Sequence, residues 1–241
     1  MKIVKRLNTF LLRFSTGIDQ FERHYLVARH VEDHFLNGKI LDIGGRYGYF
    51  KRFLKLPVTV LNTDGTGDVN YDGGRIPFDK NFFECVVSFD TIEHIPPGER
   101  KKFVDECVRV AKKMVIITTP YGSEEHIEAE KELNEEYLKA FGKYHHYLNE
   151  HVELGLLSSE EIIEYTKEYG DVELFFSGNF KSQNRRFEKE ITLRKRFGIF
   201  SLPLILIGKI FSRTIFHRVS FNEVQDEFSN RMYAILRING E

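Results

Sequence analysis

The sequence predicts an α/β fold in which a doubly wound, mostly parallel sheet carries helices on both faces. Short apolar runs without polar alternation recur along the chain, as expected for strands that are buried on both faces. Segments with apolar residues at helical spacing separate these runs. The 241 residues suit one domain of ordinary size with an appendage. In such a sheet a ligand binds beyond the carboxyl ends of the strands, so the residues that follow each strand are the candidates for chemistry.

Composition excludes several classes of protein. A hydrophobic fraction of 41% excludes a wholly disordered chain, and two cysteines exclude a disulfide scaffold. A formal net charge of -1 argues against binding of nucleic acid by bulk electrostatics. No apolar run reaches the roughly 18 residues that a spanning helix needs, and no signal peptide of the usual form is visible. We therefore expect a cytoplasmic protein.

The first 36 residues read as a helical segment. Apolar residues recur there at helical spacing, and Gly17 divides the segment into two helices. The first of these, Met1 to Phe14, is basic on one side and apolar on the other. Such a helix can lie in a membrane interface.

The rest of the chain alternates between strand and helix patterns. Six strands are predicted, at residues 39–43, 58–61, 85–89, 114–118, 172–176 and 232–238. Helices are predicted at 50–56, from 96 onward, at 123–150, and after a capping-box pattern at 158–161. The Gly- and Asp-rich stretch 65–79 reads as a loop.

Glycines and acidic residues follow the first two strands. Asp42 precedes the glycine bend Gly44, Gly45 and Gly48, where backbone can turn tightly and let a ligand approach. Asp64 follows the second strand, and a carboxylate at that place can accept hydrogen bonds from both hydroxyls of a ribose. Asn62 is the alternative ribose contact, since it lies nearer to the strand end.

Two further polar groups stand later in the chain. Asp72 precedes an apolar stretch at 76–78, so its carboxylate can accept from an adenine amino group while the apolar residues flank the ring. Asp90, Thr91, Glu93 and His94 follow the strand at 85–89. Glu is seldom buried without a partner, so this segment is better explained by chemistry than by core packing.

In this order and spacing, these marks resemble class I S-adenosylmethionine-dependent methyltransferases of the broad small-molecule type. The resemblance is carried by residues 40–50, 71–89 and 90–95, with 114–120 as the fifth strand. It covers about 38–176 plus the final strand. It implies a Rossmann-like, seven-stranded sheet with an antiparallel last strand, and S-adenosylmethionine (SAM) as cofactor. The core domain would be 37–176 with 231–241, after an N-terminal helical segment at 1–36.

The resemblance also implies roles for single residues. Asp42, Gly44, Gly45 and Gly48 would cradle the amino-acid end of the cofactor, Asp64 would hold the ribose, Asp72 would contact the adenine, and Asp90 and Thr91 would line the pocket near the sulfonium. Arg46 stands where the family usually has the middle glycine of its first motif. Its side chain would either contact the cofactor carboxylate or turn to solvent.

Methyl transfer from a sulfonium is an in-line displacement, so the protein mainly aligns the reactants and excludes water. A hydroxyl or amine acceptor also benefits from a general base. The candidates are His94, His146 and His151, with Glu93 as an orienting carboxylate; the run 143–151 alone holds three His and two Tyr. His145 and Glu150 are further members of this set, and we expect the site to need no metal ion.

Residues 177–230 form a long insertion between the last two strands. Residues 181–218 carry ten Lys and Arg against two Glu, around the most apolar run of the chain at 197–211. Two interpretations stand: a buried helical hairpin with cations facing water, or a membrane-facing segment at 195–215. The second favours O-methylation of a small-molecule or lipid-linked acceptor, such as a glycan.

Two other functions remain open. The basic insertion could clamp RNA for an RNA methyltransferase, but no recognisable RNA-binding module is visible, and we hold nucleic acid an unlikely partner. The chain could also be a catalytically inactive protein of the same fold that binds a partner, and Arg46 is the support for that interpretation. Calorimetry with the cofactor would distinguish the inactive protein from an enzyme.

Overall fold

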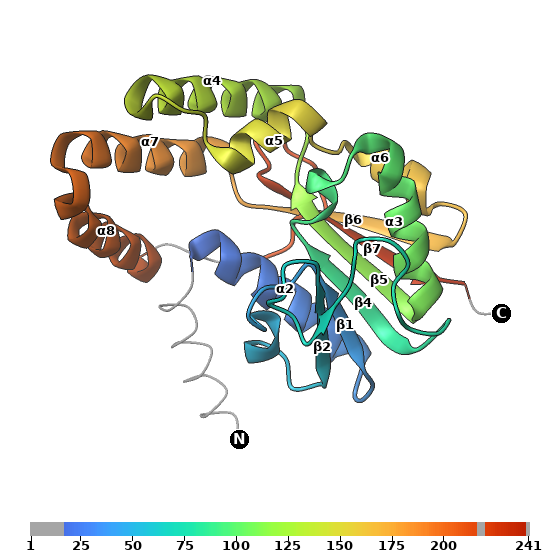
Figure 1. Ribbon diagram of the computed structural model, residues 1–241. Coiled ribbons are helices and arrows are strands. Elements are labelled where there is room, and N and C mark those ends of the chain that lie inside the picture. The colour runs from blue at the N-terminus through green and yellow to red at the C-terminus, as the bar shows by residue number, and fades with distance from the viewer. Residues whose placement is uncertain (1–16, 216–219, 240–241) are drawn as a thin grey trace.

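The computed structural model describes residues 17–215 and 220–239, and within them a seven-stranded sheet forms the centre of the molecule (Figure 1). The spatial order of its strands is β3-β2-β1-β4-β5-β7-β6. Their bounds are β1 Ile40–Ile43, β2 Val58–Asn62, β3 Val69–Asn70, β4 Phe83–Phe89, β5 Ala111–Pro120, β6 Gly170–Ser177 and β7 Arg231–Ile238. Only β7 runs antiparallel to its neighbours. The predicted fold class is confirmed.

Strands β1 and β4 pair at the middle of the sheet, with Ile40 opposite Cys85. All four residues of β1 are buried, because helices cover both faces. Each of the six predicted strands is present. The seventh strand, β3, lies in the stretch predicted as a loop; two residues are too few to show a strand pattern in the sequence.

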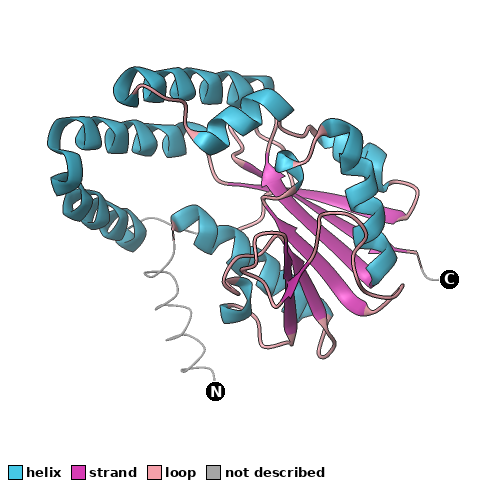
Figure 2. Cartoon of the chain, in the orientation of Figure 1, coloured by secondary structure: helices cyan, strands magenta, loops and turns pink. Residues whose placement is uncertain are grey.

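Helices flank the sheet on both sides (Figure 2). Their bounds are α2 Ile18–His34, α3 Pro97–Val110, α4 Glu124–Phe141, α5 His146–Leu154, α6 Ser159–Thr166, α7 Phe180–Phe197 and α8 Ser201–Ile215. The apolar side of α2 packs on one face of the sheet, where Val27 and Val31 join Ile40 in one core. Helices α3 and α6 pack on the other face through Val104 and Ile162. The predicted amphipathic helix Met1 to Phe14 lies outside the described residues.

Of three helix predictions, one is wrong in type, one is wrong in length and one is confirmed. The helix predicted at 50–56 is only a 3₁₀ turn, η1 Phe50–Arg52. The helix predicted at 123–150 is two helices, because Gly142 adopts a left-handed φ of 71° that ends α4. The capping box is confirmed: the Ser158 hydroxyl accepts from the Glu161 backbone, and the Glu161 side chain accepts from the Ser158 backbone.

The insertion builds an arm of two helices beside the sheet (Figure 1). Helix α7 packs on α4 and α5, where Ile191 joins Leu133 and Leu148 in a small core. Helix α8 turns back from α7, and most apolar side chains of residues 201–208 are exposed. The exposed ones in the arm are Phe197, Ile199, Phe200, Leu202, Leu204, Leu206 and Ile207. The segment is helical as that interpretation expected, but residues 197–207 are not buried apart from Ser201 and Ile205, so the interpretation as a buried hairpin is wrong for the rest of that range.

Within residues 17–215 and 220–239, no helix combines the length and the hydropathy that crossing a membrane requires. The division of the chain into a helical segment, a core and an insertion stays a prediction. Helix α2 nevertheless shares one hydrophobic core with the sheet.

Candidate functional site

A cavity of about 720 Å³ opens beyond the carboxyl ends of β1 and β4. This size lies within the range of small-molecule sites. Its walls come from α2, the glycine bend after β1, the segment after β4, and helices α4 and α5. The cavity thus lies at the edge of the sheet where the fold class predicts a ligand.

The carboxylate of Asp42 forms the floor of the cavity next to the glycine bend. Asp42 is 1% exposed, and neither of its oxygens has a hydrogen-bond partner. Burial raises the pKa of Asp42 to about 7. A buried carboxylate without a partner is costly, so this group is suited to a ligand that brings a donor or a positive charge.

The bend leaves no room for a side chain at Gly44 or at Gly45. A Cβ on Gly45 would lie 2.2 Å from Asp42 Oδ2, and a Cβ on Gly44, whose φ is +80°, would lie 2.1 Å from Thr91 Oγ1. An orphaned acid beneath exposed backbone fits the ammonium and carboxylate end of SAM. Gly48, also at positive φ, lies outside the cavity lining.

Arg46 connects the bend to α5 at the rim of the cavity. Its Nε lies 3.1 Å from Asp64 Oδ2, and its Nη1 donates to the Tyr147 hydroxyl at 3.3 Å. The side chain is 56% exposed. Arg46 therefore leaves the cavity open rather than filling it.

The two aspartates predicted to contact the ribose and the adenine lie outside the lining of the cavity. Asp64 accepts hydrogen bonds from the backbone and hydroxyl of Thr66, which lower its pKa. Asp72 accepts from the Gly74 backbone in its own turn. Neither aspartate lines the cavity, whereas Asn62 does. The ribose and adenine roles stay predictions, and Asn62 has the better position for the first.

Asn62 also holds the glycine bend in place. Its Nδ2 donates to the Gly45 carbonyl at 2.8 Å, and its Oδ1 accepts from the Thr63 backbone. The side chain is 7% exposed. The end of β2 thus supports the loop that follows β1.

Asp90 is held by two arginines that the sequence did not identify. It adopts a φ of 47°, and its carboxylate pairs with Arg23 from α2 and with Arg231 from β7. Arg231 also pairs with Asp19 at 3.0 Å, and Arg23 with Asp19 at 2.7 Å. The spacing of four between Asp19 and Arg23 was a visible signal, but nothing in the sequence linked either of them to Asp90.

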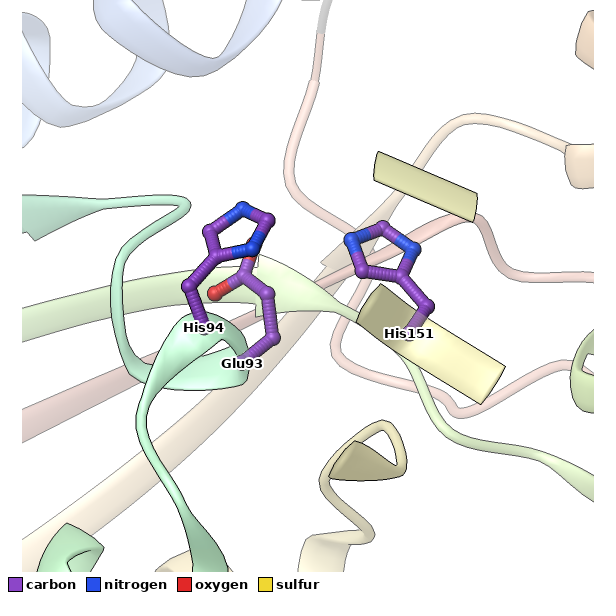
Figure 3. A group of neighbouring side chains, drawn as sticks. All are labelled: Glu93, His94 and His151. Atoms are coloured by element: carbon purple, nitrogen blue, oxygen red, sulfur yellow. The ribbon is translucent and has the colours of Figure 1, made fainter. Parts of the chain in front are cut away.

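Glu93, His94 and His151 come together above this network, although 57 positions separate the two histidines (Figure 3). The two imidazole centroids are 5.4 Å apart. Glu93 is fully buried; its Oε2 accepts from Thr119 Oγ1 at 3.2 Å, and its Oε1 has no partner. Burial, together with the nearby charge of Asp90, raises the pKa of Glu93 to about 8.

Each histidine of this cluster has a carboxylate behind it. His151 Nδ1 lies 2.8 Å from Glu130 Oε2, and His94 Nδ1 lies 2.8 Å from Glu150 Oε2. Burial and the neighbouring imidazole lower the pKa of His94. Burial is the largest single influence on the pKa of His151 and lowers it. The hydrogen bond and charge of Glu130, together with the charges of Glu93 and Asp90, raise it by more, so the pKa is raised.

The remaining histidine candidate lies apart from the cluster. The His146 side chain is 75% exposed, and its Nε2 is 3.5 Å from Glu150 Oε1 at the rim. Glu130, which the sequence analysis did not identify, contacts the cluster directly, whereas His146 does not. Its carboxylate bridges His151 and the buried His126.

Comparison with known proteins agrees with this geometry. A family model described as a methyltransferase domain matches residues 41–118, from β1 to β5. That range contains the glycine bend, Asp90, Glu93 and His94. No curated protein matches the chain.

Solved structures share the fold at low sequence identity. A phosphoethanolamine N-methyltransferase 2 of Haemonchus contortus, in complex with SAM, has a TM-score of 0.50 and 18% identity, over 89% of this chain and 52% of that one. A possible histamine N-methyltransferase of Thermotoga maritima has a TM-score of 0.54 and 12% identity, over 99% of this chain and 97% of that one. A putative sarcosine dimethylglycine methyltransferase of Galdieria sulphuraria has a TM-score of 0.51 and 19% identity, over 88% of this chain and 82% of that one.

This chain therefore spans about half the length of the Haemonchus enzyme. The strand order, the glycine bend over an unpartnered acid and the match over 41–118 lead to one assignment. The chain contains a class I S-adenosylmethionine-dependent methyltransferase domain.

Proposed function

We propose that this domain methylates a hydroxyl of a small-molecule or lipid-linked acceptor, such as a glycan. One observation carries the proposal: the unpartnered carboxylate of Asp42 and the Glu93, His94 and His151 cluster line the same cavity. A cofactor site and a group of acid–base side chains thus share one enclosed space.

The chain's own residues divide the work. Asp42 and the backbone of Gly44 and Gly45 bind the amino-acid end of SAM, which supplies an activated methyl group when bound. The Asp90 carboxylate, fixed by Arg23 and Arg231, is a rigid wall beside the reacting atoms. Fixed geometry of this kind is the main source of rate in a displacement reaction.

His94 is the proposed general base. Its lowered pKa keeps the imidazole neutral at pH 7, so that it can accept the proton of an acceptor hydroxyl. Glu150, 2.8 Å from Nδ1, orients the ring and stabilises the charge that proton uptake creates. Glu93, protonated near neutral pH, adds no charge next to the base.

The test is turnover of radiolabelled SAM with a panel of hydroxyl and amine acceptors, including lipid-linked glycans. We expect label in a hydroxyl product, and a loss of about 10²–10⁴-fold in turnover for His94→Ala. If only amines become labelled, the proposal of O-methylation is wrong and the domain is an N-methyltransferase. N-methylation is the activity in the names of two similar proteins. Absence of SAM binding would favour the inactive binding protein.

The exposed apolar side of the arm supports contact with a membrane surface. Ile199 and Phe200 are 75% and 80% exposed, and they follow Lys195 and Arg196 after two intervening residues. Apolar side chains next to cations favour an anionic lipid surface, and an isolated exposed patch of this kind marks an interaction site.

Flotation with anionic liposomes tests this surface. We expect the wild type to float and the double variant Ile199→Ser, Phe200→Ser to lose most of the bound fraction. Leu36→Ser removes an equally exposed apolar side chain elsewhere, since Leu36 is 98% exposed, and should float like the wild type. A wild type that stays with the unbound protein removes the membrane from the proposal.

A further inference from the structure

We propose that Glu93, His94 and His151 bind a divalent transition-metal ion in the wall of the cavity. Each residue offers one ligand atom, and these atoms lie within 4.8 Å of one another. Two ligands on opposite sides of one ion, each at about 2.1 Å, are about 4.2 Å apart. The three groups therefore need to close by less than about 1 Å. The sequence predicted no metal, because it could not show that His151 meets the pair at 93–94.

The buried carboxylate is the first argument for a cation. Glu93 is fully buried, and its Oε1 has no hydrogen-bond partner. A buried oxygen without a partner is costly, and a bound cation would favour the ionised carboxylate and pair with it. Arg23 and Arg231 pair with Asp90, and the buried Arg100 donates to backbone carbonyls rather than to Glu93.

The carboxylates behind the imidazoles are the second argument. Glu130 Oε2 accepts from His151 Nδ1 at 2.8 Å, which leaves His151 Nε2 free to bind a ligand. Glu150 lies 2.8 Å from His94 Nδ1. Metal-binding histidines are commonly oriented, as His151 is by Glu130, through a carboxylate on the other ring nitrogen. Figure 3 shows the two rings facing one another from η2 (Ile92–His94) and α5, with the Glu93 side chain next to the His94 ring.

The set of ligands indicates the kind of ion. Two imidazoles and one carboxylate suit Zn²⁺, Fe²⁺, Co²⁺ or Mn²⁺, whereas Mg²⁺ and Ca²⁺ prefer oxygen ligands alone. Three protein ligands leave coordination positions open, as in catalytic rather than structural metal sites. All three residues line the cavity, so those positions face the space proposed for the acceptor. An acceptor oxygen as a further ligand is the part of this inference that rests on the proposed function.

Titration of the full chain with Co²⁺, after treatment with a chelator and without SAM, tests the site. Binding is followed by the visible absorption of Co²⁺ and by calorimetry, with Zn²⁺ as a competitor. We expect roughly one equivalent per chain, displaced by Zn²⁺. His151→Ala and Glu93→Gln should each weaken binding more than tenfold. Glu130→Gln, which alters the carboxylate that His151 shares with His126, should weaken it by about 10–100-fold.

His34→Ala is the matched control, since this exposed histidine on α2 belongs to no such cluster in the described residues. It should bind Co²⁺ like the wild type. Circular dichroism checks that each variant is folded, and the wild-type titration does not depend on the variants. A wild type that binds neither ion, or a folded His151→Ala with unchanged affinity and spectrum, overturns the proposal. Because no methyl transfer is measured, failure of the metal site leaves the proposed methylation standing, and the reverse also holds. His94 cannot act as the general base while it binds an ion, so binding would take that role away from His94.

Discussion

The backbone of Gly45 lies directly against the carboxylate of Asp42: a Cβ on Gly45 would lie 2.2 Å from Asp42 Oδ2. Backbone and acid are thus packed so closely that only glycine fits between them. The arrangement keeps both Asp42 oxygens free of hydrogen bonds within the protein. The glycine at 45 therefore shapes the proposed cofactor site through space rather than through backbone conformation.

We predict that Gly45→Ala weakens SAM binding by at least tenfold, because the methyl group displaces the Asp42 carboxylate. Calorimetry measures the affinity. Gly98→Ala is the control: no atom lies within 4 Å of a Cβ at that position, and its φ is not in the left-handed region. Equal affinities of the two variants would mean that the glycine bend does not hold the cofactor.

The affinity for SAM should depend on pH through Asp42. Burial raises the pKa of Asp42 to about 7, so the empty site holds a proton below that pH. The ammonium of the cofactor pairs with the ionised form, and its own pKa is about 7.7–8.0. Between about pH 7 and pH 5.5, affinity should therefore fall as pH falls, by up to about tenfold per pH unit.

Calorimetry at several pH values measures this dependence, and Asp42→Asn is the matched variant. It should bind more weakly at pH 7.5 and show a nearly flat profile over the same range. A wild-type profile as flat as that of Asp42→Asn would remove Asp42 from the binding of the ammonium.

Arg231 should be important for stability. It is 3% exposed and pairs with both Asp19 and Asp90, so Arg231→Ala leaves two carboxylates partly uncompensated. Breaking a buried ion pair costs about 3–5 kcal/mol. The free energy of unfolding, measured in urea, should fall by about that amount.

Arg237→Ala serves as the control on the same strand, because the ion pair of Arg237 with Glu173 is exposed on both sides. Exposed pairs contribute less than about 1 kcal/mol. If the two variants unfold at the same urea concentration, the network around Asp90 does not stabilise the domain.

His24 should make the domain sensitive to acid. Burial, reinforced by the charge of Arg23, lowers its pKa to about 3, whereas an unfolded chain has the ordinary value of 6.5. Below pH 6.5 the unfolded state binds a proton that the folded state does not. Stability should therefore fall as pH drops from about 6.5 toward 3, by up to about 1.4 kcal/mol per pH unit.

His24→Phe should reduce this slope, since an apolar ring can keep the stack on Phe89, whose centroid is 4.3 Å from that of His24. Urea unfolding between about pH 4.5 and pH 7 measures it. The exposed His34→Phe on the same helix is the control. An unchanged slope in His24→Phe would assign the acid sensitivity to other groups.

The fold could be read from the sequence because its signals are local. A buried parallel strand such as 85–89 is apolar apart from Ser88, and the capping box at 158–161 specifies the start of a helix within four residues. The two-residue strand β3 and the break at Gly142 were not predicted from the sequence, because short elements depend on their neighbours for hydrogen bonds and packing. The exposure of Phe200 also escaped, since an apolar run has the same composition in a core and on a surface.

The sequence by itself determined which groups stand at the ends of the strands: Asp42 with its glycines, then Asp90, Glu93 and His94. Parallel strands bring their carboxyl ends to one edge, so residues that follow different strands become neighbours. Only the tertiary structure decided which side chains from other parts of the chain contact these groups. Arg231 reaches Asp90 from the last strand, and Glu130 and His151 come from helices whose packing no local pattern encodes. Burial, which shifts the pKa of Asp42 and Glu93, likewise exists only once the chain has closed around them.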